Sequence, residues 1–142
     1  MTVDKIDIQE SRESSYRRLV RPRMMDELKK GILRQIAVKR KFRNPNYNAR
    51  KLAEDLQTNV RYISAVVRVQ FHMNYSSFVN KYRVEEAKSI LADQRYFDLK
   101  LEDVGDMVGF AHRQSFYAAF QKYTGMTPKA YRNHYLDNEN QI

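Results

Sequence analysis

The sequence predicts an all-α protein of about seven helices, in which a long linker helix joins two helix-turn-helix units. Three observations support this fold class. Apolar residues recur mostly three and four positions apart, which is the period of one face of a helix. Only four glycines and three prolines interrupt the 142 residues. The order short helix, turn, second helix also occurs twice along the chain.

The N-terminal residues 1–20 carry no sustained apolar period. We expect them to form a flexible arm or a weak leading helix, made basic near its end by Arg17 and Arg18. The first regular helix is expected from about Met25 to Lys41. The residues predicted to face its core are Met25, Leu28, Ile32, Leu33 and Ile36. The turn-forming stretch 44–46 ends this helix.

The domain suggested by this pattern spans residues 21–137. Its first helix-turn-helix is expected at about 49–71, with helices over 49–56 and 60–71. The linker helix is expected at about 76–94, and it should turn inward Phe78, Tyr82, Ala87, Ile90 and Leu91. The second unit is expected at about 101–123, with helices over 101–108 and 112–123.

A closing helix is predicted to begin at Thr127 and Pro128. Threonine can cap the first turn, and proline is suited to the first helical position. We expect this helix to end near Asp137 and residues 138–142 to form a frayed tail.

The two helix pairs align with each other in apolar and polar order. Residues 52–56 match 104–108, and the second unit has one more residue in its turn. Small residues stand at the matching positions Ala53 and Gly105. Because two helices of such a unit cross steeply, a large side chain there would hold them apart.

The second helix of each pair leaves a face of small and hydrogen-bonding side chains. Arginine can donate twice to guanine, glutamine can pair with adenine, and alanine can touch a thymine methyl. The candidate base-reading residues are Arg61, Ser64, Ala65, Arg113, Gln114, Tyr117 and Ala118. Tyr117 fits equally well a core edge with an exposed hydroxyl.

Four further residues are candidates for contact with DNA phosphates: Tyr62, Arg68, His112 and Gln121. His112 also fits an ordinary role at a helix end. The basic run 39–41 allows two interpretations, a phosphate contact or a solvated helix C-terminus.

The charge balance favours a polyanionic partner. The chain has 26 lysines and arginines against 17 acidic residues, a formal net charge of +9. Each phosphate that a cation neutralises releases condensed counterions. Charge alone does not separate DNA from RNA or from anionic lipid.

The residue types in the chain argue against several other classes of protein. Without cysteine there is no disulfide framework or thiolate metal site, and the three histidines lack metal-ligand spacing. We find no phosphate-binding glycine loop and no nucleophile–histidine pair, so we expect neither an enzyme nor a cofactor. No apolar run approaches the roughly 20 residues of a membrane span. We therefore expect a soluble, cytoplasmic protein without a membrane partner.

The second helix pair resembles the AraC/XylS family of bacterial transcription regulators, and the first pair is similar to that family's first unit. The resemblance covers about residues 25–135. The stretches that carry it in the second half are Asp103–Phe110, Gln114–Phe116, Phe120–Lys122, Gly125–Pro128 and Tyr131–Arg132. In the first half they are Leu52–Ala53, Tyr62–Ser64 and Tyr82–Ala87.

The resemblance implies a seven-helix domain that activates or represses promoters by placing the second helix of each unit in the major groove. It implies double-stranded DNA as a partner, with RNA polymerase or other transcription proteins. The chain departs from the family at Ala65 and Ala118, where arginine is usual. No small-molecule effector domain is visible, so we expect the DNA-binding module alone, free-standing or as part of a larger regulator.

The leading hypothesis is a sequence-specific regulator that reads two successive major grooves. A linker of about 19 residues would span about 28 Å, against about 34 Å between such grooves. The alternative is a basic module that binds DNA without sequence preference or serves as a protein-interaction adaptor. A helical RNA-binding protein is a third hypothesis, which the absence of RNA-module signatures disfavours.

Overall fold

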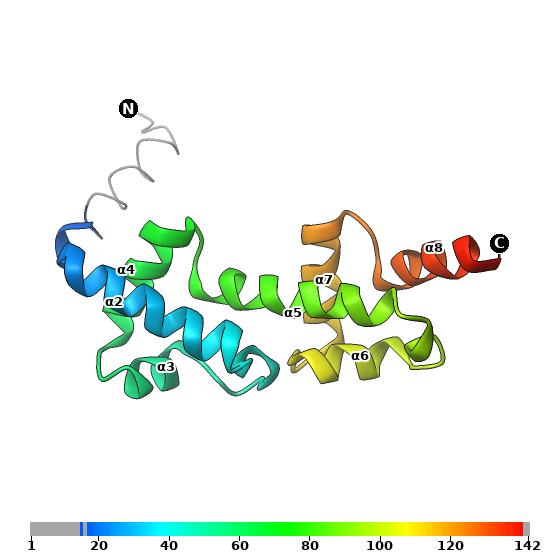
Figure 1. The fold of residues 1–142 in the computed structure, drawn as a ribbon, viewed down its shortest axis with the longest axis horizontal. Coiled ribbons are helices and arrows are strands. Elements are labelled where there is room, and N and C mark those ends of the chain that lie inside the picture. Colours follow the sequence, from blue (N-terminus) through cyan, green and yellow to red (C-terminus); the bar gives the residue numbers. More distant parts are fainter. Residues whose placement is uncertain (1–14, 16, 141–142) are drawn as a thin grey trace, which may run out of the picture. The chain divides into compact units, whose positions relative to one another are not determined.

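The computed structural model describes residue 15 and residues 17–140. Within this part of the chain all regular structure is helical, which confirms the predicted all-α class. The elements can be followed in Figure 1. The α-helices with assigned bounds are α2 (Pro22–Leu33), α3 (Ala49–Asp55), α4 (Val60–Phe71), α5 (Tyr75–Leu91), α6 (Leu101–Val108), α7 (Arg113–Thr124) and α8 (Pro128–Asn140).

The chain divides into two compact units. Unit 1 contains the residues up to 40 together with 47–78, and unit 2 contains 41–46 together with 79–142. The pair α3 and α4 belongs to unit 1, and the pair α6 and α7 belongs to unit 2. Helix α5 begins in unit 1 and continues in unit 2.

Helix α2 differs from its expected bounds at both ends. It begins at Pro22, which suits the first helical position because that position needs no amide donor. From Arg34 to Val38 the helix widens into a π-helix, in which Lys39 N–H donates to the Arg34 carbonyl at 2.8 Å. The prediction of one regular helix to Lys41 was therefore wrong. Wide turns of this kind are rare and have no simple sequence signature.

The predicted N-terminal arm lies largely outside the described residues. Residues 1–14 and 16 are not described, whereas residues 17–19 are helical. Val20 follows them and is only 2% exposed, so this end of the arm belongs to the core of unit 1.

The core of unit 1 is formed by apolar side chains from α2, α3 and α4. The fully buried ones are Ile32, Leu52, Ile63, Ala65, Val66 and Val67, and Ile36 of the π-helix joins them. Helices α2 and α3 both contact α4. Gly31 allows α2 to approach the end of α3, since a Cβ there would lie 2.9 Å from a methyl carbon of Leu56.

The core of unit 2 gathers side chains from α5, α6 and α7. It consists of Val84, Ala87, Leu91, Val104, Val108, Phe110, Phe116, Ala119 and Phe120. Of the residues expected to face inward on α5, Phe78, Ala87 and Leu91 are buried. Tyr82 and Ile90 are only half-buried, so that expectation was too broad.

The helix crossings have the small residues that the sequence predicts. Ala53 is 3% exposed. At Gly105 a Cβ would lie 2.7 Å from Cδ2 of Phe116, well inside contact distance. A larger residue would push α6 and α7 apart, which confirms the reason given for the glycine.

The two units also share the geometry of their turns. Each first helix is followed by a residue with positive φ, Gln57 at 56° and Gly109 at 108°. The second helix is capped at Asn59 in unit 1 and begins after His112 in unit 2. Counted from the residue with positive φ to the residue before the second helix, the turn has three residues in unit 1 (57–59) and four in unit 2 (109–112), as the alignment of the repeats predicts.

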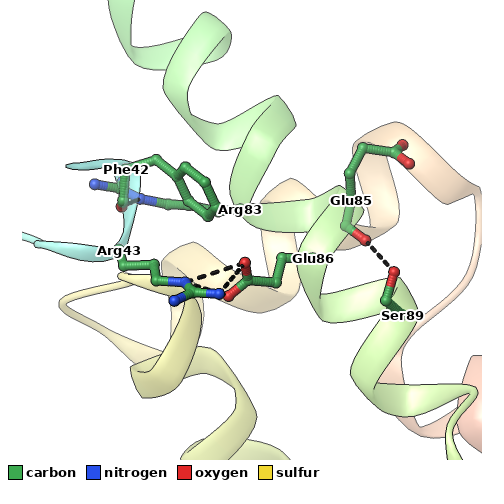
Figure 2. Close-up of polar contacts among 6 residues, drawn as sticks. All are labelled: Phe42, Arg43, Arg83, Glu85, Glu86 and Ser89. Atoms are coloured by element: carbon green, nitrogen blue, oxygen red, sulfur yellow. Dashed lines mark hydrogen bonds and ion pairs between the residues drawn. The ribbon is translucent and has the colours of Figure 1, made fainter. Parts of the chain in front are cut away.

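The segment 41–46 packs within unit 2. In the sequence, the residues before it and after it belong to unit 1. The Arg43 guanidinium faces the Glu86 carboxylate on α5 and donates to both of its oxygens, at 2.8 and 3.1 Å from Nε (Figure 2). Arg83 donates from Nε to the Phe42 carbonyl at 2.7 Å. Phe42 itself is 5% exposed. From the sequence, 44–46 is predicted to end a helix and the basic residues before it to be a phosphate contact or a solvated helix end, and neither interpretation predicts this packing.

Helix α8 begins where the sequence predicts. Oγ1 of Thr127 accepts the Ala130 N–H at 3.1 Å, so threonine caps the helix and Pro128 follows it. The helix continues to Asn140, past the expected end near Asp137. Within the predicted tail at 138–142, residues 141 and 142 lie outside the described part of the chain.

Candidate nucleic-acid interface

Helix α4 presents a narrower polar face than its sequence suggests. The Oδ1 atom of Asn59 accepts the Tyr62 N–H at 2.9 Å and begins the helix. Arg61 is exposed, whereas Ser64 and Arg68 are half-buried. These three side chains lie on one arc of the helix, because they are three to four residues apart.

Ala65 does not lie on this polar face. It is 0% exposed, so the expectation that it faces outward is wrong, and its methyl group cannot reach a base. Val69, one turn further on, is also buried at 5%. The physical reason is a second buried stripe on α4, which adds to the stripe of Ile63 and Val67. A helix packed by both α2 and α3 has little surface left.

Helix α7 presents a broader face. Arg113, Gln114, Ala118 and Gln121 are exposed, and Tyr117 is half-buried. Ala118, which matches Ala65 in the repeat, therefore remains accessible on α7. Four of the five residues predicted on this face are thus exposed, and Tyr117 is partly exposed.

Arg113 is held at the start of α7 by two neighbours. Its Nη1 lies 3.0 Å from Oε1 of Glu102 on α6. Its guanidinium carbon lies 5.0 Å from the ring centre of Tyr117, one turn along α7. These contacts restrict the arginine without covering it, because its side chain is 60% exposed. It can still donate to an acceptor outside the protein.

The candidate phosphate contacts are divided between the two second helices. Tyr62 and Arg68 are half-buried on α4, while His112, just before α7, and Gln121, in its last turn, are exposed. His112 is the residue before the first turn of α7, and its side chain makes no capping hydrogen bond. The N–H groups of that first turn are therefore not satisfied by the His112 side chain.

Sequence reasoning missed a group of cations beside Arg113. Lys100, Lys129 and Arg132 line a pocket that Arg113, Glu102 and Tyr117 also line. They come from the beginnings of α6 and α8, and about thirty residues separate them along the chain. Two signals were available in the sequence: Lys100 and Lys129 lie beside predicted helix starts, and Arg132 belongs to a stretch that carries the family resemblance.

Two further observations bear on alternative functions. Among the described residues, no group of three or more histidine or acidic side chains is arranged to hold a metal ion. The helices in this part of the chain are also too short or too polar to span a membrane.

Comparison with known proteins places these features in a family. A family model described as a helix-turn-helix domain matches residues 52–134. This match includes the first helix pair from Leu52, all of α5 and the second pair.

Two similar proteins are named as regulators. The chain is 30% identical over 82 residues to an uncharacterized HTH-type transcriptional regulator, YtdP, of Bacillus subtilis, covering 58% of this chain and 10% of that protein. It is 26% identical over 81 residues to the melibiose operon regulatory protein of Escherichia coli K12, covering 57% of this chain and 26% of that protein. The chain thus spans about a quarter or less of these relatives.

A solved structure shares the fold. The C-terminal domain of the two-component response regulator yesN from Fusobacterium nucleatum is 27% identical in sequence. The TM-score is 0.61, and the match covers 70% of this chain and 94% of that domain. The likeness extends over nearly the whole of the solved domain.

Proposed function

Because this chain belongs to the AraC-type helix-turn-helix family of DNA-binding transcription regulators, we propose that it binds double-stranded DNA with sequence specificity. In this proposal the second helix of each unit enters a major groove, and the two grooves are successive. The observation that carries it is the repeated helix pair, whose second helices keep exposed hydrogen-bonding side chains over a packed apolar core.

The base-reading role is assigned to residues that remain accessible. On α4 these are Arg61 and Ser64, and on α7 they are Arg113, Gln114, Tyr117 and Ala118. Ala65 is withdrawn because it is buried. Arg113 is the best placed, since it lies at the N-terminal end of α7, where recognition helices contact base edges.

Phosphate contacts are proposed for Tyr62, Arg68, His112 and Gln121. Such contacts fix the register of a protein on the duplex but carry no sequence information. The net charge of +9 supports them, because binding to a polyanion gains from counterion release. Binding should therefore weaken steeply as salt concentration rises.

The proposed cellular role follows from this activity. We propose that the chain regulates transcription in the bacterial cytoplasm and that it contacts RNA polymerase or another transcription protein. The named relatives are bacterial regulators, which supports this role. The family is a class of regulators and not of enzymes, and we propose no catalytic activity.

The decisive experiment is selection from random duplexes of about 20 base pairs. We expect one enriched motif, bound at least a thousandfold more tightly than unrelated DNA. A basic module without sequence preference would instead give a ratio near one. That result, or the absence of any enriched motif, would overturn the proposal.

Two arginines provide a test inside the selected complex. Arg113→Ala should weaken binding by about 1–3 kcal/mol and relax the preference at one base pair, if Arg113 reads a guanine. Arg68→Ala should weaken all duplexes alike, since a phosphate is present in each. Equal and sequence-independent losses from both variants would contradict the role assigned to Arg113.

A further inference from the structure

A pocket of about 580 Å³ lies in unit 2, where the beginnings of α6, α7 and α8 meet. Four cationic side chains line it: Lys100, Arg113, Lys129 and Arg132. The pocket also contains the carboxylate of Glu102. Positive charge therefore exceeds negative charge in its wall by three.

The carboxylate does not neutralise the whole group. Glu102 pairs with Arg113, with 3.0 Å between Oε1 and Nη1. Lys100, Lys129 and Arg132 have no ion-pair partner among the described residues. Three like charges around one pocket repel one another, and an anion bound between them would relieve that repulsion.

Arg132 is fixed in the pocket wall. Its Nη1 donates a short hydrogen bond to the Leu99 carbonyl, which prevents the guanidinium from swinging into solvent. Its Nε is buried and has no hydrogen-bond partner in the described part of the chain. Leaving such a charged donor unsatisfied is unfavourable, and a nearby anion would offset part of this cost.

The beginning of α8 adds to the positive potential. Thr127, Pro128 and Lys129 all line the pocket, and they form the N-terminal end of a helix of 13 residues. Pro128 has no N–H and the Ala130 N–H is bonded to Thr127, so the dipole of the helix is what favours negative charge at this end. Fixed cations and a helix N-terminus together are suited to a phosphate group.

We propose that this pocket holds a backbone phosphate of bound duplex DNA. This inference rests on the proposed function and identifies a phosphate site for unit 2 that the sequence did not predict. Arg113 and Tyr117 belong both to the pocket wall and to the candidate base-reading face of α7. The phosphate would therefore flank the base pair that Arg113 contacts and fix the position of α7 in the groove.

The test compares two double variants on the duplex obtained by selection. Lys100→Gln with Lys129→Gln removes two charges from the pocket and keeps most of each side chain's length. The control, Lys88→Gln with Arg95→Gln, removes the same net charge from unit 2 outside the pocket. All four positions are polar and at least partly exposed, so both variants should fold, which circular dichroism would verify.

The first measurement is the slope of log affinity against log salt concentration. One lost phosphate contact should reduce the slope of the pocket variant by about 0.9, while the control keeps the slope of the parent chain. Equal slopes in the pocket variant and the parent would overturn the pocket proposal. Selection would still return a motif in that case, so the proposed function would stand.

The second measurement places the phosphate. Single phosphates of the duplex are replaced one at a time by neutral methylphosphonates. One position should weaken the parent chain roughly tenfold and leave the pocket variant unchanged. If every position affects both proteins equally, the proposal is wrong.

The remaining outcome is that the pocket binds a free anion. If inorganic phosphate raises the melting temperature of the parent but not of the pocket variant, and no methylphosphonate position distinguishes them, the pocket binds a small anion and not DNA. That result would also overturn the proposal. Failure of the proposed function looks different, because the parent itself would then select no motif.

Discussion

Replacing Gly109 by alanine tests how tightly the turn of the second helix pair is packed. Gly109 has φ 108°, a conformation that L-residues rarely adopt. A Cβ there would lie 2.2 Å from the Phe42 carbonyl oxygen and 2.8 Å from two backbone atoms of Arg43. Because all three atoms belong to the backbone of segment 41–46, the whole segment would have to move.

The expected cost has two parts. Backbone strain at positive φ accounts for about 1–2 kcal/mol. Displacing the segment would expose much of Phe42, whose burial is worth about 1.5–3 kcal/mol, and would disturb the hydrogen bond from Arg83. We expect Gly109→Ala to lower the free energy of unfolding by about 3–5 kcal/mol. A protein of ordinary stability has a free energy of unfolding of about 5–15 kcal/mol, so this substitution would remove a large part of it.

Gly125→Ala is the matched control. Gly125 ends α7 as Gly109 ends α6, and it also has positive φ, 74°, but a Cβ there would meet nothing within 4 Å. Its replacement should cost only the strain, about 1–2 kcal/mol. Both variants are compared with the parent by urea unfolding, followed by far-ultraviolet circular dichroism. If both substitutions lower the free energy of unfolding equally, the close approach of the segment 41–46 to Gly109 is not the cause of the loss.

A double-mutant cycle makes the test sharper. If the alanine Cβ acts by displacing Phe42, then Gly109→Ala should cost less in a Phe42→Ala background than in the parent. We expect the two changes to be non-additive by about 1 kcal/mol or more. Strict additivity would indicate that strain at Gly109 alone destabilises the turn.

Three further predictions concern stability. Gln35→Leu should raise the free energy of unfolding by about 1 kcal/mol, because its buried Oε1 has no hydrogen-bond partner among the described residues. A lower free energy of unfolding in urea would show that the amide is satisfied. Gln57→Gly should gain about 0.5–1 kcal/mol by relieving positive φ, and no gain in melting temperature would contradict this. Burial and the contact with Tyr135 raise the pKa of Tyr131 to about 12, so folding favours the neutral phenol. The free energy of unfolding should therefore fall as pH rises from about 10 to about 12, and it should fall less steeply in Tyr131→Phe. If the parent and Tyr131→Phe lose stability equally over this range, Tyr131 is not the group responsible.

The helices and their repetition could be predicted from the sequence because these features depend on neighbours three or four residues apart. The bounds of α4 and α6 coincide with their expected ranges. The small residue at Gly105 also indicated a close helix crossing, which the distance to Phe116 bears out. Such signals are local, and a single chain contains them in full.

The accessibility of matching residues could not be predicted in the same way. Ala65 and Ala118 have the same type and the same place in the repeat, yet one is fully buried and the other exposed. Helical periodicity shows which residues share a face. Whether that face is covered depends on which other helices pack against it.

What the sequence alone determined is the helical class, the paired repeat and the polar residues along α7, since all of these follow from local spacing and residue type. Only the tertiary structure decided that segment 41–46 packs beneath Gly109 and that Lys100 and Lys129 line one pocket. Those contacts join parts of the chain tens of residues apart. The energy that selects them comes from burial and charge in three dimensions, and no spacing along the chain encodes it directly.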